Sequence, residues 1–189
     1  MVSESRAVQG FHTIVVAGAV RAVVTFGADE RLEITAEDNL IELVEAVVTD
    51  GRLTVKWRPG TGSVSSLGVV CRIGARGLRG IAGSGASRFE IAGIDAGDFA
   101  VDLSGSSSFV GSGTVERLRL DVSGASRAES AELTARFANA MLSGASVARL
   151  RVVDALVVNA SGASLLEYFG DPGVQAETSG ASIVRRIGR

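Results

Sequence analysis

One short motif recurs along the second half of the chain and constrains the fold more than any other feature of the sequence. The tetrapeptide Ser-Gly-(Ala/Ser)-Ser begins six times, at Ser84, Ser104, Ser123, Ser143, Ser161 and Ser179. Successive copies lie 20, 19, 20, 18 and 18 residues apart. This period is too short for helical repeats, and the Leu/Asn consensus of leucine-rich repeats is absent. The motif therefore predicts a solenoid whose coils are built from short strands.

Apolar and polar side chains alternate before each tetrapeptide, which is the pattern of a half-buried strand. A second short apolar run follows each tetrapeptide, as in Phe89 and Ile91. Each repeat thus predicts two strands and a corner. The side chains expected to face the interior are Phe99, Val101, Leu103, Leu118, Leu120, Val122, Leu156, Val158, Ala160, Val174, Ala176 and Thr178.

Stacked coils of this kind place equivalent strands in parallel, about 4.8 Å apart, so that each coil hydrogen-bonds to its neighbours. We therefore expect an all-β fold, a right-handed parallel β-helix with about 19 residues per coil. Glycine adopts the positive φ of a tight corner, which the Cβ of other residues resists. The structural corners are assigned to the glycine of each tetrapeptide: Gly85, Gly105, Gly124, Gly144, Gly162 and Gly180.

The N-terminal part of the chain is also rich in apolar runs but lacks the tetrapeptide. Residues 11–57 contain five such runs, separated by hairpin-like breaks that include Ala17-Gly18 and the tight-turn pair Asp50-Gly51. The segment 38–43 is compatible with a helical turn.

Three segments divide the chain, and we expect them to form one domain over residues 1–189. The N-terminal strands (11–57) are followed by a loop and lead-in (59–77) and by the coils (78–189). We expect the N-terminal strands to cover the first coil, because an open solenoid end exposes apolar side chains and unpaired strand edges.

Composition and single residues exclude several functional classes. Nineteen basic and 21 acidic residues give a net charge of −2, which argues against nucleic-acid binding. No apolar run is long enough for a transmembrane segment. Cys71 is the only cysteine and His12 the only histidine, so neither a disulfide nor a Cys/His metal site is expected. No cofactor is expected, since no Gly-rich phosphate loop opens a helix.

Polar residues in the outward register form the candidate binding face: Asp102, Asp121, Asn159 and Glu177, with Met141 interrupting the row. A row of acids could bind Ca²⁺ or cleave a polysaccharide. We favour a solvated surface suited to repeated contacts, because the register turns these side chains outward. No catalytic or metal-binding residue is assigned.

Two further series have a structural interpretation. Corner hydroxyls commonly bond to nearby backbone, although a sugar or an ice-like lattice is the alternative partner. These hydroxyls belong to Ser104, Ser123, Ser143, Ser161 and Ser179. Arginines near the C-terminus are expected to form a solvated rim that deters end-to-end stacking: Arg185, Arg186 and Arg189.

The order of several short motifs resembles that of a known family. They are Arg6-Ala7-Val8-Gln9-Gly10-Phe11, Leu32-Glu33-Ile34 followed by Asp38-Asn39-Leu40, Gly51-Arg52-Leu53-Thr54-Val55, the Ser-Gly-x-Ser series and Leu166-Glu167-Tyr168-Phe169-Gly170-Asp171-Pro172. Together they resemble the bacterial auto-transporter adhesin "head GIN domain" family over nearly the whole chain. The sequence departs from the family in using Ala at many corner positions where Gly is common. The resemblance implies a β-helical fold, a cell-envelope location and an adhesive role.

We therefore expect a non-catalytic binding or adhesion module whose partner is a glycan, lipid or protein at the cell surface. One alternative is a cytoplasmic β-solenoid scaffold that self-assembles into a homo-oligomer. Another is a carbohydrate-active β-helix enzyme. The native start decides the location: export to the periplasm or cell surface if a leader was removed, and the cytoplasm if Met1 is the native start.

Overall fold

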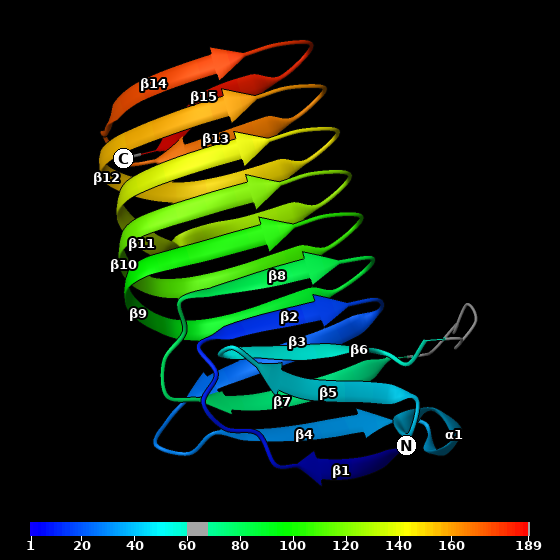
Figure 1. Ribbon diagram of the computed structural model, residues 1–189. Coiled ribbons are helices and arrows are strands. Elements are labelled where there is room, and N and C mark those ends of the chain that lie inside the picture. Colours follow the sequence, from blue (N-terminus) through cyan, green and yellow to red (C-terminus); the bar gives the residue numbers. More distant parts are fainter. Residues whose placement is uncertain (60–67, 189) are drawn as a thin grey trace.

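The chain forms one continuous fifteen-stranded sheet that winds around a common axis (Figure 1). A computed structural model describes residues 1–59 and 68–188. Strands account for 69% of these described residues and helix for 2%, and the expected β-solenoid has about five turns. The elements are β1 (Val2–Arg6), β2 (Thr13–Ala17), β3 (Val20–Phe26), β4 (Arg31–Ala36), α1 (Asp38–Ile41), β5 (Val44–Thr49), β6 (Arg52–Trp57), β7 (Val69–Ala75), β8 (Gly80–Ser84), β9 (Arg88–Leu103), β10 (Ser108–Val122), β11 (Arg127–Leu142), β12 (Val147–Ala160), β13 (Leu165–Phe169), β14 (Gly173–Thr178) and β15 (Ile183–Gly188).

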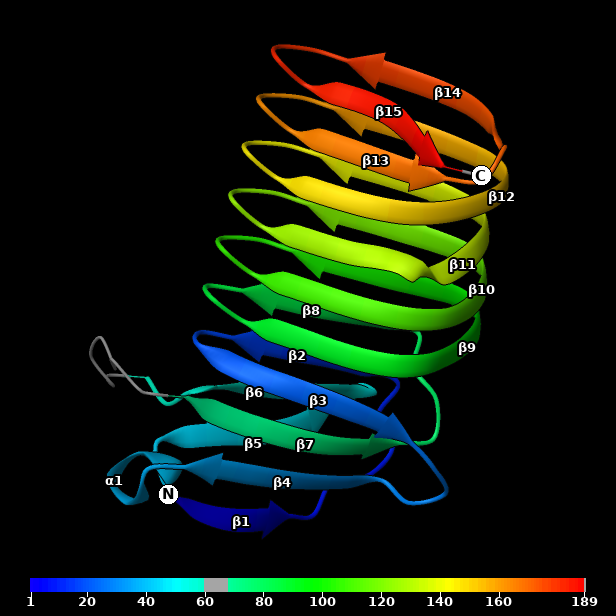
Figure 2. The same ribbon diagram turned by 180° about the vertical axis from the view of Figure 1, so that it is seen from behind.

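The central coils differ from the expected two strands and a corner. Each of β9 to β12 is one long strand that bends midway, where its pairing shifts register, as between Val110 and Ser112 of β10. A β-bulge bends a strand with only a local break in its ladder. Glycines with positive φ stand at this bend in β9 and β10, Gly93 and Gly113, whereas β11 and β12 bend without glycine. The bend divides each coil into a back face, which follows a tetrapeptide, and a front face, which precedes the next one. Figure 1 shows the front face and Figure 2 the back face.

The corner glycines allow successive coils to approach closely. All six have φ between +70° and +77°. At Gly124, an added Cβ would lie 2.5 Å from the carbonyl oxygen of Gly105 in the preceding coil. That carbonyl accepts a hydrogen bond from the backbone N–H of Ala125 at 2.7 Å. A side chain at Gly124 would therefore disturb both the local backbone and the contact between coils.

A second serine column lies inside the corners. The last serine of each tetrapeptide is buried in five coils, as Ser87, Ser107, Ser126, Ser146 and Ser164. The hydroxyl of Ser107 donates to the carbonyl of Ser104 at 2.7 Å, and that of Ser164 to Ser161 at 3.0 Å. These bonds close the corner from within and satisfy polar groups that burial would otherwise penalise.

The alternating pattern places most of the expected side chains in the core. Those from Phe99 to Leu103, Leu118 to Val122 and Leu156 to Ala160 are buried. The prediction is wrong for the last coil, in which every residue of β14 is exposed. β14 pairs only with β12, so no described coil covers its other side.

The N-terminal strands extend the solenoid instead of forming mainly hairpins. β2 pairs in parallel with β6 and β8, and β3 with β7 and β9. Ala17-Gly18 is therefore a coil corner, whereas Asp50-Gly51 does join an antiparallel hairpin, β5 to β6. Antiparallel β4 and β1 complete this end (Figure 1). The short helix α1 lies within the segment 38–43, where a helical turn was expected.

The segment assigned to a loop and lead-in contains the strand β7. Val69, Cys71, Ile73 and Ala75 alternate into the core, and β7 pairs with both β3 and β4. Burial raises the pKa of the Cys71 thiol to about 12, as expected of a small buried apolar side chain. Residues 60–67 of the assigned loop lie outside the described residues.

Alternating charges connect the coils on the back face. Arg149 lies between two carboxylates, 3.6 Å from Glu129 and 2.7 Å from Glu167. The Arg185 guanidinium also donates to Glu167, with Nε 3.0 Å from the carboxylate. Glu167 is only 4% exposed. Hydrogen bonds from Arg185 and Arg149 lower its pKa, because they favour the charged form.

The corner geometry predicts that Gly124→Ala destabilises the fold by about 1–3 kcal/mol, the usual range for a strained backbone conformation. The matched control is Gly97→Ala, where an added Cβ meets nothing within 4 Å and φ is ordinary. Denaturant unfolding measures both variants. Equal stability of the two would contradict the assigned role of the corner glycine.

The inner serine column predicts different effects on stability when serine is replaced by alanine at two of its positions. Ser107→Ala removes a hydroxyl that bonds to Ser104 and should destabilise by about 1 kcal/mol. Ser146→Ala removes a buried hydroxyl with no partner among the described residues and should be neutral or stabilising. Thermal unfolding of the two variants distinguishes them, and a reversed order would refute the interpretation.

The back-face charges predict a loss of stability in acid. Because the folded-state pKa of Glu167 is lowered, its contribution is complete above the unfolded-state pKa of about 4.3 and is lost as the pH falls through the folded value. Glu167→Gln should therefore melt earlier than wild type at neutral pH and lose less stability on acidification. Glu132→Gln, at an exposed back-face position, is the control. If the melting temperatures of wild type and Glu167→Gln fall equally with decreasing pH, Glu167 does not have this role.

Candidate binding face

The candidate residues occupy one column on the front face. In the parallel register, Asp102 pairs with Asp121, Asp121 with Met141, Met141 with Asn159, and Asn159 with Glu177. This arrangement follows from side-chain parity, since each residue lies two positions before a corner serine and its neighbours in the strand point inward.

The carboxylates of this column face solvent. The Asp121 side chain is 42% exposed and lies 3.6 Å from Arg119 of the same strand. Within residues 1–59 and 68–188, no three His, Cys, Asp or Glu side chains are grouped so that they could hold a metal ion. The carboxylate oxygens of the column can therefore accept hydrogen bonds from hydroxyl or amide groups of a partner that lies across it.

Two shallow grooves flank the column near the corners. One, of about 340 Å³, is lined by Asp102, Asp121, Ser104 and Ser123. The other, of about 430 Å³, is lined by Asp121, Asn159, Glu177 and nearby serines. All four candidate residues therefore border a groove, although no groove encloses them.

Three of the five leading corner serines from Ser104 to Ser179 bond to the backbone through their hydroxyls. The hydroxyls of Ser104, Ser123 and Ser161 lie 3.2–3.4 Å from carbonyl oxygens of the preceding coil. Such bonds are the structural use expected from the sequence.

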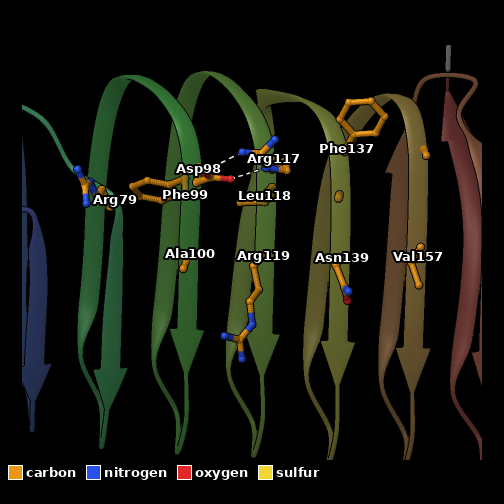
Figure 3. A pocket seen from close by; sticks show the side chains of 12 residues that line it. Arg79, Asp98, Phe99, Ala100, Arg117, Leu118, Arg119, Phe137, Asn139 and Val157 are labelled. Atoms are coloured by element: carbon orange, nitrogen blue, oxygen red, sulfur yellow. Dashed lines mark hydrogen bonds and ion pairs between the residues drawn. The ribbon is translucent and has the colours of Figure 1, made fainter.

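A third groove, of about 520 Å³, lies between the column and the bend and was not predicted from the sequence (Figure 3). Ala100, Arg119, Asn139 and Val157 form one row of it, contributed by β9, β10, β11 and β12. Because the groove crosses four successive coils, it runs along the solenoid axis.

A charged pair and an exposed aromatic ring border this groove on the side of the bend. Arg117 donates to Asp98 through two hydrogen bonds, of 2.5 and 2.9 Å. The next residue in that register is Phe137, which is 39% exposed. The sequence does carry a signal for it, since Phe137 has the same parity as Met141 and so falls in the outward register.

The ring of Phe137 is held in place by Arg136. The guanidinium carbon of Arg136 lies 5.3 Å from the ring centroid, a cation–π contact. Arg136 itself pairs with Glu116 at 3.1 Å and with Asp154 at 2.6 Å. Carboxylates from both adjacent coils therefore fix the cation, and the cation supports the ring.

The back face also has a groove, of about 560 Å³, with different chemistry. Val23, Val110 and Ala131 contribute apolar surface, and the charged side chains that line it are carboxylates, among them Glu90 and Glu129. Glu90 is already paired with Arg21 at 2.6 Å. The charged lining of this groove thus accepts hydrogen bonds, whereas the charged lining of the front-face groove both donates and accepts them.

Helices in the described part of the chain are limited to α1, and none has the length and apolar character needed to cross a membrane.

Solved structures share this fold at low sequence identity. A "putative adhesin" from Bacteroides fragilis has 18% identity and a TM-score of 0.69, covering 100% of this chain and 96% of its own. A "putative adhesin" and a "putative lipid binding protein" from Parabacteroides distasonis have 16% and 14% identity and TM-scores of 0.58 and 0.54. Each of these two covers 98% of this chain and 96% of its own. At such identities the likeness shows the fold alone.

Comparison of the sequence itself identifies the family to which the chain belongs. No curated protein matches the chain. Residues 10–172, however, match the family described as "Putative auto-transporter adhesin, head GIN domain". The match covers most of the chain and most of the strands that form the front face, so this protein belongs to the head GIN domain family.

Proposed function

We propose that the protein is a non-catalytic binding module of the cell surface, which contacts an extended partner through its front face. The observation that carries this proposal is the arrangement of three open grooves along successive coils of one face. A repeated, open surface suits many weak contacts with a long partner, and such contacts add up to useful avidity. The family's description as an adhesin supports the same role and an exported location.

Solvent exposure of the carboxylates weighs against the enzyme alternative. Glycoside cleavage needs one carboxyl group held neutral, usually by burial, beside a second that stays ionised. Asp102 and Asp121 instead lie on an open strand surface, and Asp121 has Arg119 nearby.

The N-terminal end of the solenoid weighs against a self-assembling scaffold. There, antiparallel β1 carries Ser3, Glu4 and Ser5 and does not present a parallel coil edge to a second copy. Growth by end-to-end stacking of coils needs a matching strand edge at both ends.

Adhesion and catalysis can be tested together with Asp102→Ala/Asp121→Ala. Binding to isolated bacterial cell envelopes should weaken about fivefold, as expected for the loss of a few exposed hydrogen bonds. Glu132→Ala, at an exposed back-face position, is the matched control and should bind like wild type. Neither wild type nor variant should release reducing sugar from polysaccharides. Turnover that the double substitution abolishes, or envelope binding that it leaves intact, would overturn the proposal.

A further inference from the structure

We propose that the groove beside Phe137 binds a neutral glycan chain, laid along the solenoid axis. This inference rests on the proposed function, because it names the ligand class for the same front face. It depends on three features of the groove: its direction, its aromatic wall and its balance of charge.

The direction of the groove matches a linear polymer. Its lining comes from β9, β10, β11 and β12, and consecutive coils are about 4.8 Å apart. This step is close to the advance per ring of an extended hexose chain. One sugar can therefore meet each coil, so contacts repeat along the ligand as they repeat along the protein.

The aromatic wall offers a surface for sugar rings. Pyranose rings have apolar C–H faces, which pack on aromatic side chains. Phe137 is 39% exposed, and Arg136, itself held by Glu116 and Asp154, supports its ring. Little side-chain entropy remains to be lost when a ligand packs on a ring held in this way.

The polar groups suit hydroxyls. Arg117 and Asp98 present donors and acceptors side by side, as do Arg119 and Asp121, and Asn139 adds an amide in the same row. A sugar hydroxyl both donates and accepts, so neighbouring hydroxyls can bond to a carboxylate and to a guanidinium or amide.

The charge balance favours a neutral polymer over an anionic one. Arg117 pairs with Asp98, and Arg119 pairs with Asp121. Arg79 also lines the groove, and its charge helps to lower the pKa of Asp98. Asp102 and Glu177 extend a negative column along the same face. The three arginines of the groove are thus offset by Asp98 and by the neighbouring Asp102 and Asp121, so this part of the face has no excess positive charge to attract anionic polysaccharides or anionic lipid headgroups.

Affinity electrophoresis of the full chain tests the inference, with laminarin, galactomannan or dextran in the gel as neutral probes. Alginate serves as the anionic probe, and vesicles of phosphatidylcholine and phosphatidylglycerol serve in a co-sedimentation assay. We expect retardation by at least one neutral polysaccharide. Phe137→Ala should weaken that binding about tenfold, since stacking contributes on the order of one factor of ten, whereas Phe137→Tyr should retain it. Val110→Ala, at a 53% exposed position of the back-face groove, is the matched control and should bind like wild type.

Thermal melts of the same variants verify that they are folded, which is expected because Phe137 is a surface side chain. Binding to alginate alone, or to vesicles alone, would refute the inference of a neutral glycan while leaving the proposed function intact. Equal binding by wild type and Phe137→Ala would also refute it. If every front-face variant binds cell envelopes as well as wild type does, the proposed function is refuted as well.

Discussion

The close approach of glycine backbones at the corners is the contact on which the rest of the structure depends. From Gly105 onward, a Cβ at each corner glycine would lie 2.5–2.6 Å from the carbonyl oxygen of the glycine one coil before. Each corner must therefore be glycine if the coils are to keep strand spacing there. Once the corners are stacked, parity fixes which side chains enter the core and which form outward columns.

The corners and the front-face column could be predicted because both follow from counting. The tetrapeptide marks each corner, and distance from it gives parity, which places Asp102 in line with Asp121. The bends could not be predicted in the same way, because no motif repeats there: Gly93 and Gly113 stand at the bends of β9 and β10, but β11 and β12 bend without glycine. The insertion of β2 and β3 between later strands depends on pairing across the whole N-terminal half, which local patterns do not encode.

Phe137 shows where the hydrophobic pattern misleads. An aromatic residue is normally assigned to the core, and the small side chains beside it, Ala138 and Ala140, are easily taken for the outer surface. The structure has the reverse arrangement, with both alanines buried and the ring outside. Parity counted from the corner is the stronger rule here, because backbone stacking, and not side-chain size, sets the register.

The interleaved N-terminal coil has a consequence for the order of folding. β2 and β3 are made early, yet each lies between strands that come later in the chain. Arg21 and its ion-pair partner Glu90 are 69 positions apart. The central coils need only contacts between neighbouring repeats and can add one after another, whereas the capped end needs long-range closure. During synthesis, the first strands must therefore remain without their final neighbours until β8 and β9 have emerged. The two ends of the same solenoid should thus assemble by different routes, one by closure and the other by addition of successive coils.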